Sequence, residues 1–169
     1  MVQGKETKTT ALVLTVWSIV QSIFITLPIG VGLYRHAPLV ARLAYPFFHA
    51  GAVHALLNSW CLLSIVFMFN ISMRKLLTAY IIAISVPGVL LSAIPVVGMS
   101  GVCFALMGML SMAVERRLYW QCYLWSLILF GLIFPNMAVS VHAYCFALGT
   151  VISLLTTPIR EIMRIHQEK

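Results

Sequence analysis

Long apolar runs, each about the length that crosses a lipid bilayer, dominate the hydrophobic pattern of this chain. A membrane-spanning helix needs about 20 consecutive apolar residues, and the pattern predicts six such helices. Their approximate ranges are 10–33, 48–69, 75–94, 100–114, 118–134 and 139–157. We therefore expect an all-α, polytopic membrane protein with a six-helix bundle, in which residues 1–169 form a single membrane domain.

Charged and turn-forming residues separate the predicted spans. Arg74 and Lys75 lie between the second and third spans, and Glu115 to Arg117 follow the fourth. Prolines, which do not continue a helix, mark three further boundaries: Pro95, Pro135 and Pro158. We expect residues 34–48 to be the only long connection and to lie in the membrane interface, because basic and apolar residues alternate there.

The first apolar run has a second interpretation, because Lys5 and Lys8 precede it as in the basic start of a signal peptide. The apolar part of a signal peptide has about 7–15 residues and ends at an A-x-A cleavage site. This run is longer, and no such site follows it. We therefore interpret residues 10–33 as a retained span.

Composition supports the membrane assignment, since 62% of the residues are hydrophobic and only 9% are charged, against about 25% charged in a soluble domain.

The net charge of +7 is compatible with nucleic acid or lipid headgroups as partners. Its distribution favours a topological cause, because cytoplasmic loops are rich in Lys and Arg. With both termini cytoplasmic, only Arg35 and Arg42 lie outside. The cytoplasmic basic residues are then Lys5, Lys8, Arg74, Lys75, Arg116, Arg117, Arg160, Arg164 and Lys169. We expect the bilayer, and no nucleic acid, as a partner.

Four polar side chains lie inside the apolar segments. Burying a polar side chain in hydrocarbon costs free energy, so each is a candidate functional or structural residue. His54 and Asn58 lie in the second span, Ser100 opens the fourth and His142 lies in the sixth. At about 1.5 Å per helical residue, Ser100 lies about 22 Å from Glu115 and His142 the same distance from residue 157. The predicted orientation therefore places these groups at one level, slightly below the outer membrane surface.

Together these residues supply what acyl transfer needs: a nucleophile, a base and donors for an oxyanion. Ser100 follows Gly98 and opens a helix, where backbone N–H groups are unpaired; taken alone, it could equally be a helix N-cap. His142 could be a packed structural histidine, and His54 and Asn58 an interhelical hydrogen-bonding pair. No acid lies at this depth to complete a triad, so we expect a Ser–His dyad. The four acids, all at cytoplasmic positions, are Glu6, Glu115, Glu161 and Glu168.

Metal binding and disulfide formation are not expected. His49 and His54 are five residues apart, about 140° around a helix, so they make a poor metal pair. We interpret His49 as a structural residue that anchors the 34–48 connection. The four cysteines lie in apolar stretches and behave there as small apolar residues; they are Cys61, Cys103, Cys122 and Cys145.

Two stripes of small residues predict close packing between the fourth and sixth spans, because small side chains let membrane helices approach. The stripes are Gly101, Ala105 and Gly108 in the fourth span and His142, Cys145 and Gly149 in the sixth. Such packing would bring the hydroxyl of Ser100 within reach of His142.

These segments resemble the three signature blocks of the rhomboid family of intramembrane serine proteases. The blocks are His49-x4-His54-x3-Asn58, Gly98-Met99-Ser100-Gly101-Val102-Cys103-Phe104-Ala105-Leu106-Met107-Gly108 and His142-x6-Gly149. The resemblance covers nearly the whole chain and implies a minimal six-span core of the bacterial type, in an inner (plasma) membrane. It implies cleavage of single-span membrane proteins near the outer surface, without a cofactor.

The resemblance also implies roles for individual residues. Ser100 would be the nucleophile and His142 the general base, while His54, Asn58 and the backbone N–H of Ser100 would form the oxyanion hole. Supporting roles fall to Gly98, Gly101, Phe104 and His49.

Three departures from the family pattern bear on these expectations. Phe104 stands where many members have a tyrosine against the histidine, and we expect its ring still to stack there. Cys145 stands where a glycine is usual, which predicts slightly wider spacing of the fourth and sixth spans. The first outer connection lacks the common Trp-Arg pair, which leaves its conformation and any gating role open.

Three alternatives to an active protease remain at the level of sequence. The first is an inactive rhomboid-like protein that binds membrane clients without cutting them, although an inactive relative would be free to lose Ser100, His142 or Asn58. The second is a small transporter, whose polar groups should lie nearer the middle of the membrane. The third is a transpeptidase of the same fold, in which an amine replaces water.

Overall fold

The computed structural model describes residues 3–133 and 137–157, and every regular element in these two ranges is a helix. The α-helices are α1 (Gln3–Phe24), α2 (Leu39–Ala44), α3 (Ala52–Met68), α4 (Met73–Ile84), α5 (Ser100–Met109), α6 (Arg117–Phe130) and α7 (Val139–Thr156). The short 3-10 turns are η1 (Tyr45–Phe47), η2 (Gly88–Leu90) and η3 (Gly131–Ile133). The expected all-α fold is thus confirmed for this part of the chain. Predictions that fall on Pro135, Pro158, Arg160, Glu161, Arg164, Glu168 and Lys169 lie outside the described residues.

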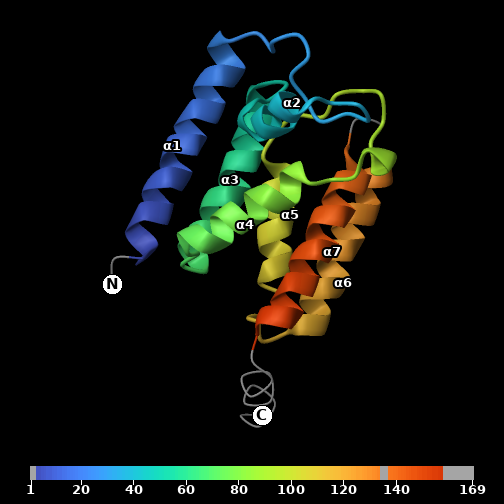
Figure 1. The fold of residues 1–169 in the computed structure, drawn as a ribbon. Helices are drawn as coiled ribbons and strands as arrows, with labels where there is room; N and C mark the ends of the chain where they lie inside the picture. Colours follow the sequence, from blue (N-terminus) through green and yellow to red (C-terminus); the bar gives the residue numbers. More distant parts are fainter. Residues whose placement is uncertain (1–2, 134–136, 158–169) are drawn as a thin grey trace.

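Helix α5 stands in the middle of the bundle (Figure 1). It packs against α3 and α4 on one side and against α7 on the other, while α1 flanks α3 and α6 flanks α7. The first turn of α1 and the last turn of α7 lie at the same end of the bundle, and residues 25–51 and 85–99 cover the opposite end (Figure 1). We call the end that carries these two connections the loop end.

Among the described residues, one helix is long and apolar enough to cross a membrane by itself, namely α7. The segments Leu39–Phe47 and Ala52–Met68 reach that length only together, and they are bent by 83° at the break between them. Helices α4 and α5 have 12 and 10 residues, or about 18 and 15 Å, against a hydrocarbon layer of about 30 Å. The count of six spans therefore stays a prediction.

Helices α1 and α4 each end at least nine residues before the apolar pattern predicts. Helix α4 ends at Ile84, ten residues before the expected end of the third span, because Pro87 and the turn η2 interrupt it. Residues 85–99 consequently form a second long connection, so the expectation that 34–48 is the only one was wrong. Helix α1 ends at Phe24 rather than near residue 33.

Helix α5 ends at Met109, six residues before Glu115, where the chain turns into i→i+3 hydrogen bonds such as that from the N–H of Ser111 to Gly108. A straight helix from Ser100 to Glu115 was the basis of the 22 Å depth estimate, which therefore does not hold for Ser100. The polar residues are brought together by side-to-side packing of α3, α5 and α7 at the loop end.

The contact between α5 and α7 is as close as the small-residue stripes predict. A Cβ atom added at Gly149 would overlap the carbonyl oxygen of Ala105, and one added at Gly108 would overlap that of Phe146. Nearer the loop end, the sulfur of Cys145 is buried against Gly101, 3.4 Å from the position of a Cβ there. Cys145 therefore does not keep the backbones apart where the glycines meet.

Backbone and arginine hydrogen bonds fix the first connection onto the second. The backbones of Leu33 and Val96 exchange two hydrogen bonds, of 2.7 and 3.0 Å. The guanidinium of Arg42 donates to the carbonyls of Ile84 and Val86 at 3.4 and 2.7 Å, so it caps the end of α4. Arg35 donates to the carbonyl of Leu91. The first connection is thus held by arginine even though it lacks a Trp-Arg pair.

Candidate active site

Ser100 is the first residue of α5 and follows a sharp turn at Gly98. Gly98 has a φ of +112°, a conformation that other residues rarely adopt, and its N–H donates to the carbonyl of Tyr45 at 3.0 Å. The N–H of Met99 points to Nε2 of His49 at 3.4 Å. These bonds fix the turn that leads into the half-buried Ser100. As the first residue of α5, Ser100 has a backbone N–H without a partner inside its own helix.

His142 lies one turn into α7, and its Nε2 is 2.8 Å from Oγ of Ser100. The imidazole is buried, at 5% exposure, and the ring of Phe104 stacks on it with centroids 4.5 Å apart. Its Nδ1 is buried and has no hydrogen-bond partner among the described residues. With the proton on Nδ1, Nε2 accepts the hydrogen of the Ser100 hydroxyl. Ser100 and His142 thus pair directly, and within residues 3–133 and 137–157 no carboxylate binds the histidine.

His54 and Asn58 lie one turn apart on α3, and both face the turn that carries Ser100. A Cβ atom at Gly98 would lie 2.8 Å from Cε1 of His54 and 3.1 Å from Nδ2 of Asn58. Asn58 is buried, and its Nδ2 has no hydrogen-bond partner among the residues that the structure describes. The structure therefore places a side-chain amide with an unpaired Nδ2 against the turn that precedes Ser100.

His49 lies before α3 rather than on it, because the helix begins at Ala52 with Gly51 as its N-cap. The argument from helical angle therefore does not apply, and the rings of His49 and His54 are in fact edge to face with centroids 5.3 Å apart. The N–H of His49 donates to Oε1 of Gln21 at 2.7 Å. His49 thus ties α1 and the first connection to the turn of Ser100. The described residues contain no group of three side chains suited to a metal ion.

Two residues of this neighbourhood were missed by sequence reasoning. Gln21 is fully buried in α1, and an amide inside an apolar run was a signal that we did not use. Tyr45 is 1% exposed, its hydroxyl donates to the carbonyl of Ala83 at 2.9 Å, and its own carbonyl holds Gly98. The role of Tyr45 depends on contacts with backbone groups, and such contacts cannot be predicted from residue types.

The arrangement has the parts of a serine-type acyl-transfer site. An imidazole within hydrogen-bond distance can remove the hydroxyl proton, and the helix start and the amide of Asn58 can donate to a developing oxyanion. These parts lie within an all-helical bundle that leaves many large apolar side chains exposed, as in a membrane protein. They include Val53, Leu57, Trp60, Leu118, Leu132 and Leu155.

Comparison with protein-family models identifies a Rhomboid domain at residues 38–158, which is most of the chain. The chain therefore belongs to the rhomboid family, whose members are embedded in membranes and are generally serine intramembrane proteases. Neither the comparison with curated proteins nor that with solved structures gives a match.

Proposed function

We propose that this chain is an intramembrane serine endopeptidase that cleaves single-span membrane proteins near the outer bilayer face, with Ser100 and His142 as a catalytic dyad. The observation that carries the proposal is the distance of 2.8 Å between His142 Nε2 and Ser100 Oγ. Membership of the rhomboid family supports it independently. No cofactor or metal takes part in the proposed reaction.

In the proposed first step, Oγ of Ser100 attacks the scissile carbonyl while Nε2 of His142 takes the hydroxyl proton. The carbonyl oxygen becomes an oxyanion, to which Asn58 Nδ2, His54 and the backbone N–H of Ser100 donate. When this intermediate collapses, His142 returns the proton to the leaving amine and an acyl-enzyme remains. A water molecule then releases the acyl group by the same sequence.

The proposed membrane arrangement has six spans and cytoplasmic termini, with the loop end toward the outside. The first turn of α1 and the last turn of α7 lie at the same end (Figure 1), as an even number of crossings requires. The basic residues Lys5, Lys8, Arg74 and Lys75 lie at that end too, in the first two turns of α1 and the first turn of α4. The serine then lies near the outer face, which water can reach.

The experiment is labelling of the detergent-solubilised protein with a fluorophosphonate, together with cleavage of a model single-span substrate in liposomes. We expect wild type to label and to cut, and Ser100→Ala and His142→Ala to do neither. Ser59→Ala is the matched control, because the Ser59 hydroxyl is buried and, in the part of the chain that the structure describes, forms no hydrogen bond to a histidine or to any other group. It should label as wild type does.

Two results would contradict the proposal. Labelling that persists in folded Ser100→Ala would remove Ser100 as the nucleophile. Folded wild type that neither labels nor cuts any substrate would instead favour an inactive rhomboid-like protein that binds membrane clients.

A further inference from the structure

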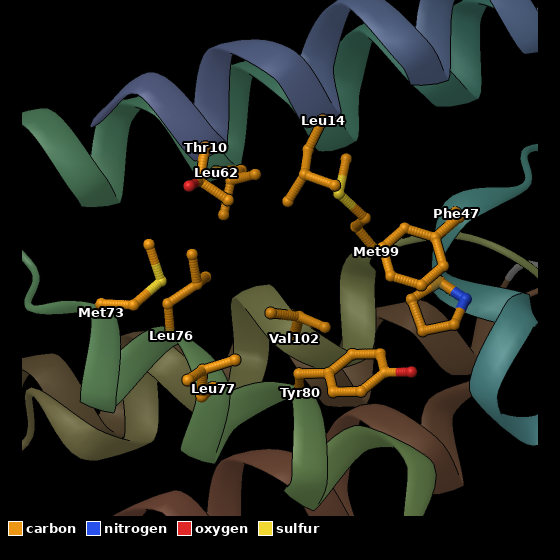
Figure 2. A pocket seen from close by; sticks show the side chains of 11 residues that line it. Thr10, Leu14, Phe47, Leu62, Met73, Leu76, Leu77, Tyr80, Met99 and Val102 are labelled. Atoms are coloured by element: carbon orange, nitrogen blue, oxygen red, sulfur yellow. The ribbon is translucent and has the colours of Figure 1, made fainter. Parts of the chain in front are cut away.

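A cavity lies between α1, α3, α4 and α5 (Figure 2). Its volume is about 270 Å³. Leu14 lines it from α1, Leu76 and Tyr80 from α4, and Val102 from α5. The hydroxyl of Tyr80 donates to the carbonyl of Leu43 at 2.8 Å, so its hydrogen is already used. The cavity therefore offers an almost wholly apolar lining.

The cavity opens sideways between α1 and α4. Leu77, which is 55% exposed, and the half-buried Leu14 lie on the open side, whereas Met99 and Val102 form the inner wall and are only 2% and 5% exposed. Because the family is embedded in membranes, this opening faces lipid. Hydrocarbon, which has no unmet hydrogen bonds, suits such a lining better than water does.

The size of the cavity restricts what enters it. A helix with its side chains is about 10–12 Å wide, so a helix from a substrate or a second copy would have to force α1 and α4 apart. A single extended hydrocarbon chain is much thinner and needs no such movement. The cavity therefore fits one acyl chain rather than a protein segment.

Basic residues gather at the end of the cavity that Met73 and Thr10 line. Arg74 and Lys75 follow Met73 directly in the first turn of α4 and are exposed. On α1, Lys8 precedes Thr10, and its ammonium lies 5.3 Å from the ring centre of Phe67. Glu6 is the one acidic residue of the first two turns of α1. The positive charge favours a lipid with an anionic headgroup.

We infer that the cavity holds one acyl chain of an anionic phospholipid, whose headgroup binds Lys8, Arg74 and Lys75. The chain runs from Met73 toward Met99, the residue that precedes Ser100. It thereby fills the space behind the start of α5, on the side away from His142. The inference does not depend on the proposed protease activity, since it concerns binding alone.

The test uses phosphatidylglycerol that carries a photoreactive diazirine in its acyl chain, incorporated into vesicles with the purified protein. After illumination, cross-linked peptides are mapped by mass spectrometry. We expect labelling at Met99 or Val102, which lipid outside the bundle does not reach because both are buried. Labelling at the exposed Val13 shows in the same sample that the probe surrounds the protein.

Two matched variants test whether the cavity itself is the site. Leu14→Phe replaces a leucine side chain that lines the cavity with a bulkier phenyl ring. Val13→Phe introduces the same ring at the neighbouring position, which is 62% exposed. We expect Leu14→Phe to lower inner-wall labelling at least tenfold and Val13→Phe to leave it unchanged. Leu77→Phe, at the mouth, should lower it as well and serves if Leu14→Phe does not fold.

The headgroup is tested with Arg74→Gln/Lys75→Gln and with a phosphatidylcholine probe. Each basic residue near an anionic lipid contributes about 1 kcal/mol, or about fivefold in affinity, so the double variant should lower phosphatidylglycerol labelling about 25-fold. If the phosphatidylglycerol and phosphatidylcholine probes label the inner wall of wild type equally, the site does not select an anionic headgroup, and that part of the inference is wrong. Labelling that is absent at Met99 and Val102, or equal in Leu14→Phe and Val13→Phe, would overturn the acyl-chain site.

Discussion

The ring of Phe104 lies flat against the imidazole of His142, with centroids 4.5 Å apart and planes inclined by 23°. Phe104 and Ser100 are four residues apart on α5, so both side chains face α7. Nδ1 of His142 has no hydrogen-bond partner within the described ranges, so packing against Phe104 is the contact that orients this side of the ring.

We predict that Phe104→Leu lowers kcat about 10–100-fold with little change in KM, since small displacements of a catalytic group have costs of this order. Phe104→Tyr keeps the stacked ring and should retain most of the activity. Phe69→Leu is the control, because it removes an aromatic contact with Trp120 away from the site. Steady-state cleavage assays compare the three; an equal loss in Phe69→Leu would mean that general packing, not ring orientation, is responsible.

Gly98 and Gly51 form a second matched pair. At Gly98 the φ of +112° and the contact with His54 both oppose a side chain, whereas Gly51 has an extended φ of 172° and open space around it. We predict that Gly98→Ala abolishes cleavage and lowers stability by about 1–3 kcal/mol, and that Gly51→Ala changes neither much. Thermal unfolding and cleavage rates measure the two effects. An active Gly98→Ala would show that the turn tolerates a side chain and does not shape the oxyanion site.

The sequence groups His54, Asn58, Ser100 and His142 as one candidate site, and the structure places them around one turn. The grouping has a physical reason: a polar side chain in an apolar run is energetically expensive, so it stands out and requires partners. The stacking of Phe104 on His142 was expected from the family resemblance, because many members have a tyrosine against the histidine at this position.

The connections were not predictable in the same way. Pairing of Leu33 with Val96 and the capping of α4 by Arg42 use backbone groups, which every residue carries. The end of α4 at Ile84 was missed because residues 85–94 are as apolar as the helix before them, although Pro87 marks the break. Apolar composition measures burial in lipid or protein, and it does not by itself specify a helix.

Arg42 and Arg35 hold the two connections together with unequal strength. Arg42 makes three hydrogen bonds to carbonyls, the shortest of 2.7 Å, whereas Arg35 makes one of 3.3 Å through its side chain. Hydrogen bonds from charged donors contribute about 1.5–3 kcal/mol each, so Arg42→Gln should lower the free energy of unfolding by more than Arg35→Gln does. Limited proteolysis of residues 85–99 and thermal unfolding measure the difference. Equal effects would mean that Arg42 does not anchor the second connection.

The glycine contact between α5 and α7 gives a stability prediction. Gly149→Val places methyl groups against the carbonyl of Ala105, and overpacking of this kind costs about 1–3 kcal/mol. Separation of the helices would also move His142 away from Ser100, so activity should fall further than stability. Val151→Leu adds bulk two residues later at a site that is 47% exposed and should be neutral. If Gly149→Val changes neither stability nor activity, the close contact between α5 and α7 is not required for either.

Substitution of Asn58 should lower activity without lowering stability, because its Nδ2 is buried and has no partner in the part of the chain that the structure describes. Replacing an unpaired polar group by an apolar one of similar volume is close to neutral or stabilising, so Asn58→Leu should unfold at the same temperature as wild type or higher. Its kcat should nevertheless fall about 10²–10³-fold, the usual cost of losing one oxyanion donor.

The measurement for Asn58 pairs thermal unfolding with kcat, and Ser59→Ala serves as the control from the next position of α3. Ser59 is also buried and unpartnered, so its loss should affect neither quantity. Residual activity in Asn58→Leu should still exceed that of Ser100→Ala, since His54 and the backbone N–H of Ser100 remain as donors. If Asn58→Leu loses stability and activity in parallel, the role of Asn58 is to pack α3 against α5 and not to donate a hydrogen bond to the oxyanion.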